Sequence, residues 1–122
     1  RDQAWLRIRG RFERGIDWSG LERERVARWY RQLHIFLYPF YYIEYGLAQL
    51  GALQIWRRSQ ADQAAAVRDY REALALGCTV SLPAMYARAG AKFGADRALI
   101  GELVALVEGE LARLRGGGGP VA

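Results

Sequence analysis

Cysteine and histidine each occur once in this 122-residue chain, at Cys78 and His34. A single cysteine excludes an internal disulfide and a cysteine-rich metal site, and it fits a reducing compartment such as the cytoplasm. A single histidine excludes H-E-x-x-H and every other motif that needs two histidines. We therefore expect no complete zinc site within the chain itself.

Lysine is also nearly absent: the chain has one lysine, Lys92, together with 17 arginines and 13 acidic residues, which gives a net charge of +5. A basic excess can attract nucleic acids or acidic membranes. Residues 1–34, however, mix nine arginines with five acids. This mixture does not favour a nucleic-acid partner. Residues 1–15 are charged throughout and begin with Arg1 rather than Met, so we expect no signal peptide and a piece of a longer, cytoplasmic protein.

Sustained alternation of apolar and polar residues is missing, so the sequence predicts no strand. The length is that of one domain. We expect an all-α fold of about five to six helices, with helix boundaries given by capping residues, glycines and Pro39. The predicted helices are Gln3–Arg14, Leu21–Leu33 with Ser19 as its cap, Pro39–Arg58, Asp62–Leu76, Ser81–Ala89 and Asp96–Arg115. Residues 1–115 form the helical part, and 116–122 a flexible Gly-rich tail.

The third of these helices lies in a long apolar stretch, because Glu44 is the only charge in Ile35–Trp56. A helix that is apolar all round is buried or spans a membrane. The length would suffice for a span. A charge at mid-bilayer costs at least a few kcal/mol, however, so we expect a buried central helix and no membrane partner.

Two further features of this helix bear on its packing. A carboxylate buried in an apolar helix needs a partner, so we expect Glu44 to pair with an arginine or to act as a site carboxylate. Gly46 and Gly51 each cost about 1 kcal/mol of helix propensity relative to alanine. Their presence indicates that another helix approaches closely there.

Aromatic residues are concentrated in the same region, with eight of the fifteen between Trp29 and Tyr45. In the predicted third helix, Tyr38, Tyr42 and Tyr45 are spaced i, i+4 and i+7, which places their hydroxyls on one side. Such a stripe is often core. Alternatively, the three phenols and His34 form a group of donors that can stabilise an oxyanion.

The sequence around these residues resembles the C-terminal catalytic-domain segment of oligoendopeptidase F-like zinc metallopeptidases, relatives of the thimet oligopeptidases. The resemblance rests on H-I-F at 34–36 and on YPFYYIEYGLAQLGALQIW at 38–56. It covers nearly the whole chain, from about Trp5 to Leu114. It continues in the same order through Tyr70, A-L-A-L-G at 73–77, S-L-P at 81–83, Tyr86, Gly90 and Phe93.

The resemblance implies an all-helical fold with a deep channel, in which zinc is held upstream by two histidines of H-E-x-x-H and by a glutamate. Glu44 does not match that glutamate. By the same resemblance, His34, Tyr38 and Tyr45 are catalytic and Tyr42 binds substrate. The intact enzyme would cleave short peptides with zinc, whereas this chain would bind no metal and be inactive alone. Its partners would be the peptide substrate and the remainder of the catalytic domain.

A second function remains open from the sequence alone. A stand-alone helical module could use its aromatic face to bind a partner helix or an apolar ligand. An exposed apolar patch of several hundred Å² would favour this interpretation, and it would also permit self-association.

Overall fold

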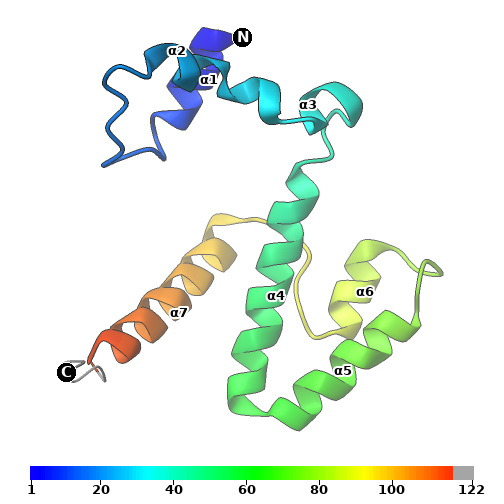
Figure 1. The fold of residues 1–122 in the computed structure, drawn as a ribbon. Helices are drawn as coiled ribbons and strands as arrows, with labels where there is room; N and C mark the ends of the chain where they lie inside the picture. Colours follow the sequence, from blue (N-terminus) through cyan, green and yellow to red (C-terminus); the bar gives the residue numbers. More distant parts are fainter. Residues whose placement is uncertain (117–122) are drawn as a thin grey trace. The chain divides into compact units, whose positions relative to one another are not determined.

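The computed structural model describes residues 1–116. Within this range it contains seven α-helices, one 3-10 helix and no strand, so the all-α prediction is confirmed with slightly more helices than expected (Figure 1). The predicted tail lies outside the described residues except for Gly116, which ends the last helix. The elements are α1 (Asp2–Arg9), α2 (Glu22–Ala27), the 3-10 helix η1 (Arg28–Arg31), α3 (His34–Leu37), α4 (Ile43–Ala61), α5 (Gln63–Ala75), α6 (Leu82–Arg88) and α7 (Arg97–Gly116).

The chain divides into two compact units, and the boundary in the sequence falls between Tyr42 and Ile43. This boundary lies inside the aromatic run. The predicted break near Tyr38 is confirmed, because α3 ends at Leu37 and Tyr38 leaves the helical region with φ −138° and ψ 70°. Proline at the next position disfavours the helical region for the residue before it.

The prediction that a helix begins at Pro39 is wrong. Residues 39–42 form a turn in which Phe40 has φ 66°, a value that side chains rarely adopt, and α4 begins only at Ile43. Tyr38 and Tyr42 therefore lie outside the helix that carries Tyr45. The shared helical face of the three tyrosines does not exist.

The first unit, Arg1–Tyr42, is built from short helices around a polar centre. The first predicted helix ends at Arg9 rather than Arg14, and the chain then turns back toward α2. Ser19 does not cap α2, because its N–H and its hydroxyl both donate to the Asp17 carboxylate. Leu21 takes the N-cap position, without a capping side chain.

The second unit begins at Ile43 and contains α4 to α7. Helix α4 packs against α5 and α7, and α5 packs against α6 (Figure 1). The ends of the helices in this unit lie close to the capping residues and glycines of the sequence. The Asp62 and Asp96 carboxylates accept hydrogen bonds from backbone N–H groups in the first turns of α5 and α7. Gly77 follows α5 with φ 54°, and Gly90 follows α6 with φ 71°.

Helix α4 is not buried as predicted. Only Gly51 and Gln54 are buried; Leu47, Leu50, Leu53 and Ile55 are half-buried, and other residues of the helix, including Ile43, are exposed. Glu44 is exposed, so the predicted burial of its carboxylate is also wrong. Within residues 1–116, no helix has both the length and the hydropathy needed to cross a membrane.

Close helix packing at Gly51 is confirmed. A Cβ added there would lie 2.8 Å from the Tyr86 ring, and the Tyr86 hydroxyl donates to the Leu47 carbonyl at 3.0 Å. Gly46, one turn and a half earlier, has no such neighbour within 4 Å. Close packing therefore requires a glycine at position 51, where Tyr86 of α6 lies against α4, and does not require one at position 46.

Candidate functional site

An open hollow of about 270 Å³ in the first unit is lined by three of the four predicted site residues, His34, Tyr38 and Tyr42. We call it the His/Tyr hollow. A single helical turn and the bend after it bring the three side chains together, because His34 begins α3, Tyr38 follows its end and Tyr42 closes the next turn. The remaining lining residues are Trp5, Arg9, Gln32, Ile35 and Phe40.

The rings of this hollow lie close to one another. The centroid of the His34 ring lies 5.0 Å from that of Tyr42, in an edge-to-face arrangement, and 6.3 Å from that of Tyr38. Tyr38 and Tyr42 are 61% and 56% exposed. Of the two interpretations of the aromatic run, a packed core therefore does not apply to these two tyrosines, since more than half of each residue is exposed.

Tyr45 is the fourth predicted residue, and it belongs to the second unit. It lies in the first turn of α4 and is 56% exposed. The structure thus groups three of the predicted residues in one hollow of the first unit and places Tyr45 on a separate element.

The sequence interpretation missed a cluster of charges beneath α1 and α2. The side chain of Glu13 is only 1% exposed, and its carboxylate accepts hydrogen bonds from the Nε atoms of Arg9 and Arg25, both at 3.1 Å. Arg28 lies 3.7 Å from the same carboxylate. Burial alone would raise the pKa of Glu13, but the hydrogen bonds and charges of Arg9 and Arg25 outweigh burial and lower it.

Tryptophans hold these arginines in place. The Arg9 guanidinium lies over the Trp5 ring at 5.4 Å, and the Arg28 guanidinium lies over the Trp18 ring at 5.2 Å. The Trp5 indole N–H in turn donates to the Arg25 carbonyl at 3.2 Å. The three tryptophans among the nine arginines of residues 1–34 were the available signal, but the net charge of that region gives no sign of it.

A second hollow, of about 240 Å³, opens beside this cluster, and we call it the Arg hollow. It shares Trp5, Arg9 and Gln32 with the His/Tyr hollow, so the two are neighbours within the first unit. Its other lining residues are Arg28 and Arg31. A basic hollow of this kind can hold an anion next to the imidazole and the phenols.

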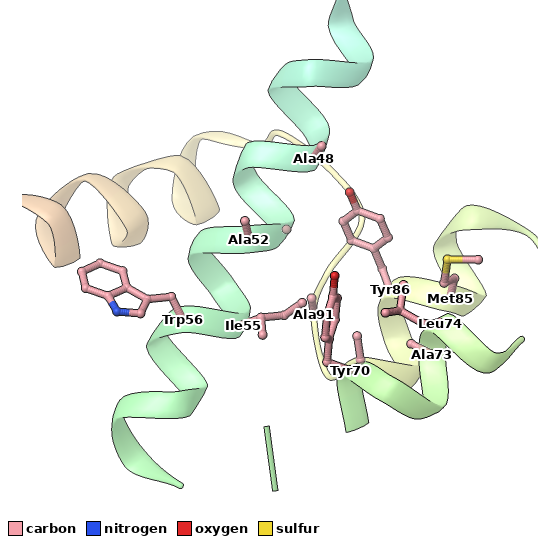
Figure 2. Close-up of a pocket in the computed structure, with 12 residues that line it drawn as sticks. Ala48, Ala52, Ile55, Trp56, Tyr70, Ala73, Leu74, Met85, Tyr86 and Ala91 are labelled. Carbon is pink, nitrogen blue, oxygen red and sulfur yellow. The ribbon is translucent and has the colours of Figure 1, made fainter. Parts of the chain in front are cut away.

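The second unit has a larger and mostly apolar groove, of about 460 Å³, between α4, α5 and α6. Figure 2 shows the Tyr70 and Tyr86 rings in it, with Ala48 and Ala52 along α4. Burial raises the pKa of Tyr86, and the Glu44 carboxylate raises it further. The hydroxyl therefore stays protonated at neutral pH and acts as a hydrogen-bond donor.

The described residues do not fit a zinc site by themselves, because no three His, Cys, Asp or Glu side chains of residues 1–116 come together as metal ligands. Comparison with protein-family models, with curated proteins and with solved structures finds no match to the chain. The resemblance to the oligoendopeptidases therefore rests on the sequence motifs alone.

Proposed function

We propose that this chain is the C-terminal part of the catalytic domain of a cytoplasmic zinc-dependent oligoendopeptidase, which hydrolyses internal bonds of short peptides. The observation that supports it most directly is the His/Tyr hollow, where His34, Tyr38 and Tyr42 surround one open space. An imidazole and phenols held around a reacting carbonyl can stabilise the oxyanion that forms during hydrolysis.

In this proposal the site residues divide the work. His34 and Tyr38 donate hydrogen bonds to the oxyanion, and Tyr45 is a catalytic residue of the intact enzyme. Tyr42 binds the substrate. Its ring lies against that of His34, so the two side chains help to orient each other.

Zinc belongs to the remainder of the catalytic domain, which would hold it and supply the hydrolytic chemistry. The surface of this chain is suited to such a partner, because many large apolar side chains are exposed, among them Ile43 on α4 and Leu111 on α7. Exposed apolar surface of this extent is typical of an interface.

The first test concerns this division of roles. The coding sequence upstream of Arg1 should contain H-E-x-x-H, and the longer protein should cleave a quenched fluorescent peptide in a chelator-sensitive manner. The 122-residue chain should not cleave the peptide. Chelator-sensitive cleavage by the chain alone, or an upstream sequence without the motif, would overturn the proposal.

The second test removes single phenols from the longer protein. Loss of one oxyanion donor lowers kcat by about 10²–10³-fold, so Tyr45→Phe and Tyr38→Phe should each reduce kcat with little change in KM. Tyr30→Phe is the matched control, because Tyr30 stacks on Trp29 and does not line the His/Tyr hollow. Equal rates for all three variants would exclude the donor role.

The groove of the second unit favours a second function, that of a helical module that binds an apolar ligand or a partner helix. Its volume lies within the range of small-molecule sites, and its lining is mostly apolar. Ala52→Trp should fill it. If the groove is a ligand site, this variant should lose the binding of a hydrophobic fluorescent dye, whereas Ala64→Trp, at a position of α5 that does not line the groove, should retain it. Equal dye binding by both variants would count against this function.

A further inference from the structure

The Arg hollow has more positive charge than its own carboxylate can balance. Three arginines, Arg9, Arg28 and Arg31, line it. Among residues 1–116, Glu13 is the carboxylate that pairs with Arg9 and Arg28, and it also pairs with Arg25. Within residues 1–116, no carboxylate pairs with Arg31, and no lining residue is acidic. The hollow therefore has an excess of positive charge that a bound anion could neutralise.

The guanidinium groups also keep hydrogen-bond donors for such an anion. Each arginine carries five N–H donors, and Arg9 gives its Nε–H to Glu13. The terminal NH2 groups of Arg9 and all the guanidinium N–H groups of Arg31 therefore remain for a ligand. Planar guanidinium groups bind a carboxylate through two parallel hydrogen bonds, which gives geometric specificity as well as energy.

The neighbouring hollow indicates which anion would fit. Trp5, Arg9 and Gln32 form a wall common to both hollows. A ligand that fills both needs a charged end for the arginines and an uncharged polar chain for the rings and the Gln32 amide. A peptide with a free C-terminal carboxylate has this chemistry.

We propose that the Arg hollow binds the C-terminal carboxylate of a peptide, whose last residues then lie in the His/Tyr hollow. This inference rests on the proposed function and narrows its substrates to short peptides with a free C-terminus. Arg31 and Arg28 bind the carboxylate, Gln32 hydrogen-bonds the last peptide group, and Trp5 supports both. Glu13 does not contact the peptide but fixes the arginines in place.

The experiment measures binding of two peptides to the 122-residue chain by isothermal titration calorimetry. Both are N-acetylated pentapeptides of the same uncharged sequence, one with a C-terminal carboxylate and the other with a C-terminal amide. The carboxylate form should bind at least tenfold more tightly. Arg31→Gln should remove this difference, and Arg23→Gln, an exposed arginine of α2 that does not line the hollow, should preserve it.

Other outcomes would overturn the inference. Equal binding of both peptides, no binding of either at millimolar concentration, or an unchanged preference in Arg31→Gln would each do so. Inorganic phosphate and acetate are then tested as competitors of the carboxylate peptide. If phosphate displaces the peptide at the same concentration as acetate, the hollow is a general anion site and not a carboxylate site. Circular dichroism checks that Arg31→Gln folds; if it does not, the comparison of the two peptides on the unmodified chain decides.

Failure here is distinguishable from failure of the proposed function. Binding of the peptides depends on the first unit alone, whereas the proposed function is tested by chelator-sensitive hydrolysis in the longer protein. A protein that hydrolyses peptides with and without a free C-terminus equally well retains the function and loses this inference.

Discussion

Gln54 is a buried polar side chain of the second unit that three hydrogen bonds hold in place. It is 4% exposed, its amide donates to the carbonyls of Leu50 and Lys92, and its oxygen accepts the Lys92 N–H at 2.8 Å. This one side chain joins α4 to the segment between α6 and α7, and it satisfies both backbone groups of Lys92.

Gln54→Ala should therefore destabilise the chain. Each hydrogen bond that the variant loses contributes about 0.5–1.5 kcal/mol, and urea denaturation followed by circular dichroism would measure the total loss. Gln49→Ala is the control, because Gln49 is an exposed glutamine of the same helix. Equal unfolding free energies for the two variants would contradict the role assigned to Gln54.

The sequence predicted which aromatic residues would lie together more readily than which charged residues would be buried. His34, Tyr38 and Tyr42 stand close together in the sequence, and local chain geometry brings them to one hollow. Glu13 and Arg31 were missed, because their environment arises only when the chain returns from α1 to α2. A count of charges along the sequence does not contain that information.

Among the elements, α4 shows how two glycines in one helix can have different roles. Gly51→Ala brings a methyl group against Tyr86, which cannot turn away without breaking its hydrogen bond to the Leu47 carbonyl. Gly46→Ala meets no neighbour and gains about 1 kcal/mol of helix propensity. Overpacking typically costs about 1–3 kcal/mol, so Gly46→Ala should be the more stable variant by roughly that amount in thermal or urea unfolding. The reverse order would contradict the packing of α6 on α4.

Helix boundaries were predictable where one local signal dominates. Asp62, Asp96 and Gly77 cap or end helices as expected, because each acts through its own backbone neighbourhood. The prediction failed where two local signals compete. Ser19 bonds Asp17 instead of capping α2, and Phe40 takes a positive φ that its residue type does not indicate.

At the scale of the whole molecule, ion pairs in both units set the expected response to pH. A hydrogen bond from Arg58 lowers the pKa of Asp69, and a hydrogen bond from Lys92 lowers that of Asp96. In the first unit, the two arginine contacts lower the pKa of Glu13 against the effect of burial. Each carboxylate is thus held more strongly in its charged form when the chain is folded.

The sign of the pH dependence follows from these directions. A carboxylate with a lowered pKa in the folded state contributes stability above its unfolded pKa, near pH 4, and this contribution is lost as the pH falls. Burial raises the pKa of Tyr86, and Asp96 raises that of Lys92, so their contribution is lost as the pH rises above about 10. The chain should therefore be most stable between about pH 5 and pH 9, as thermal unfolding across the pH range would measure.

A pair of variants tests the acid limb, which is the loss of stability as the pH falls below about 5. Asp69→Asn should make this loss smaller, and Glu24→Gln, at an exposed position of α2, should leave it unchanged. Maximal stability below pH 4, or an acid limb that Asp69→Asn leaves intact, would show that these pairs do not control the fold.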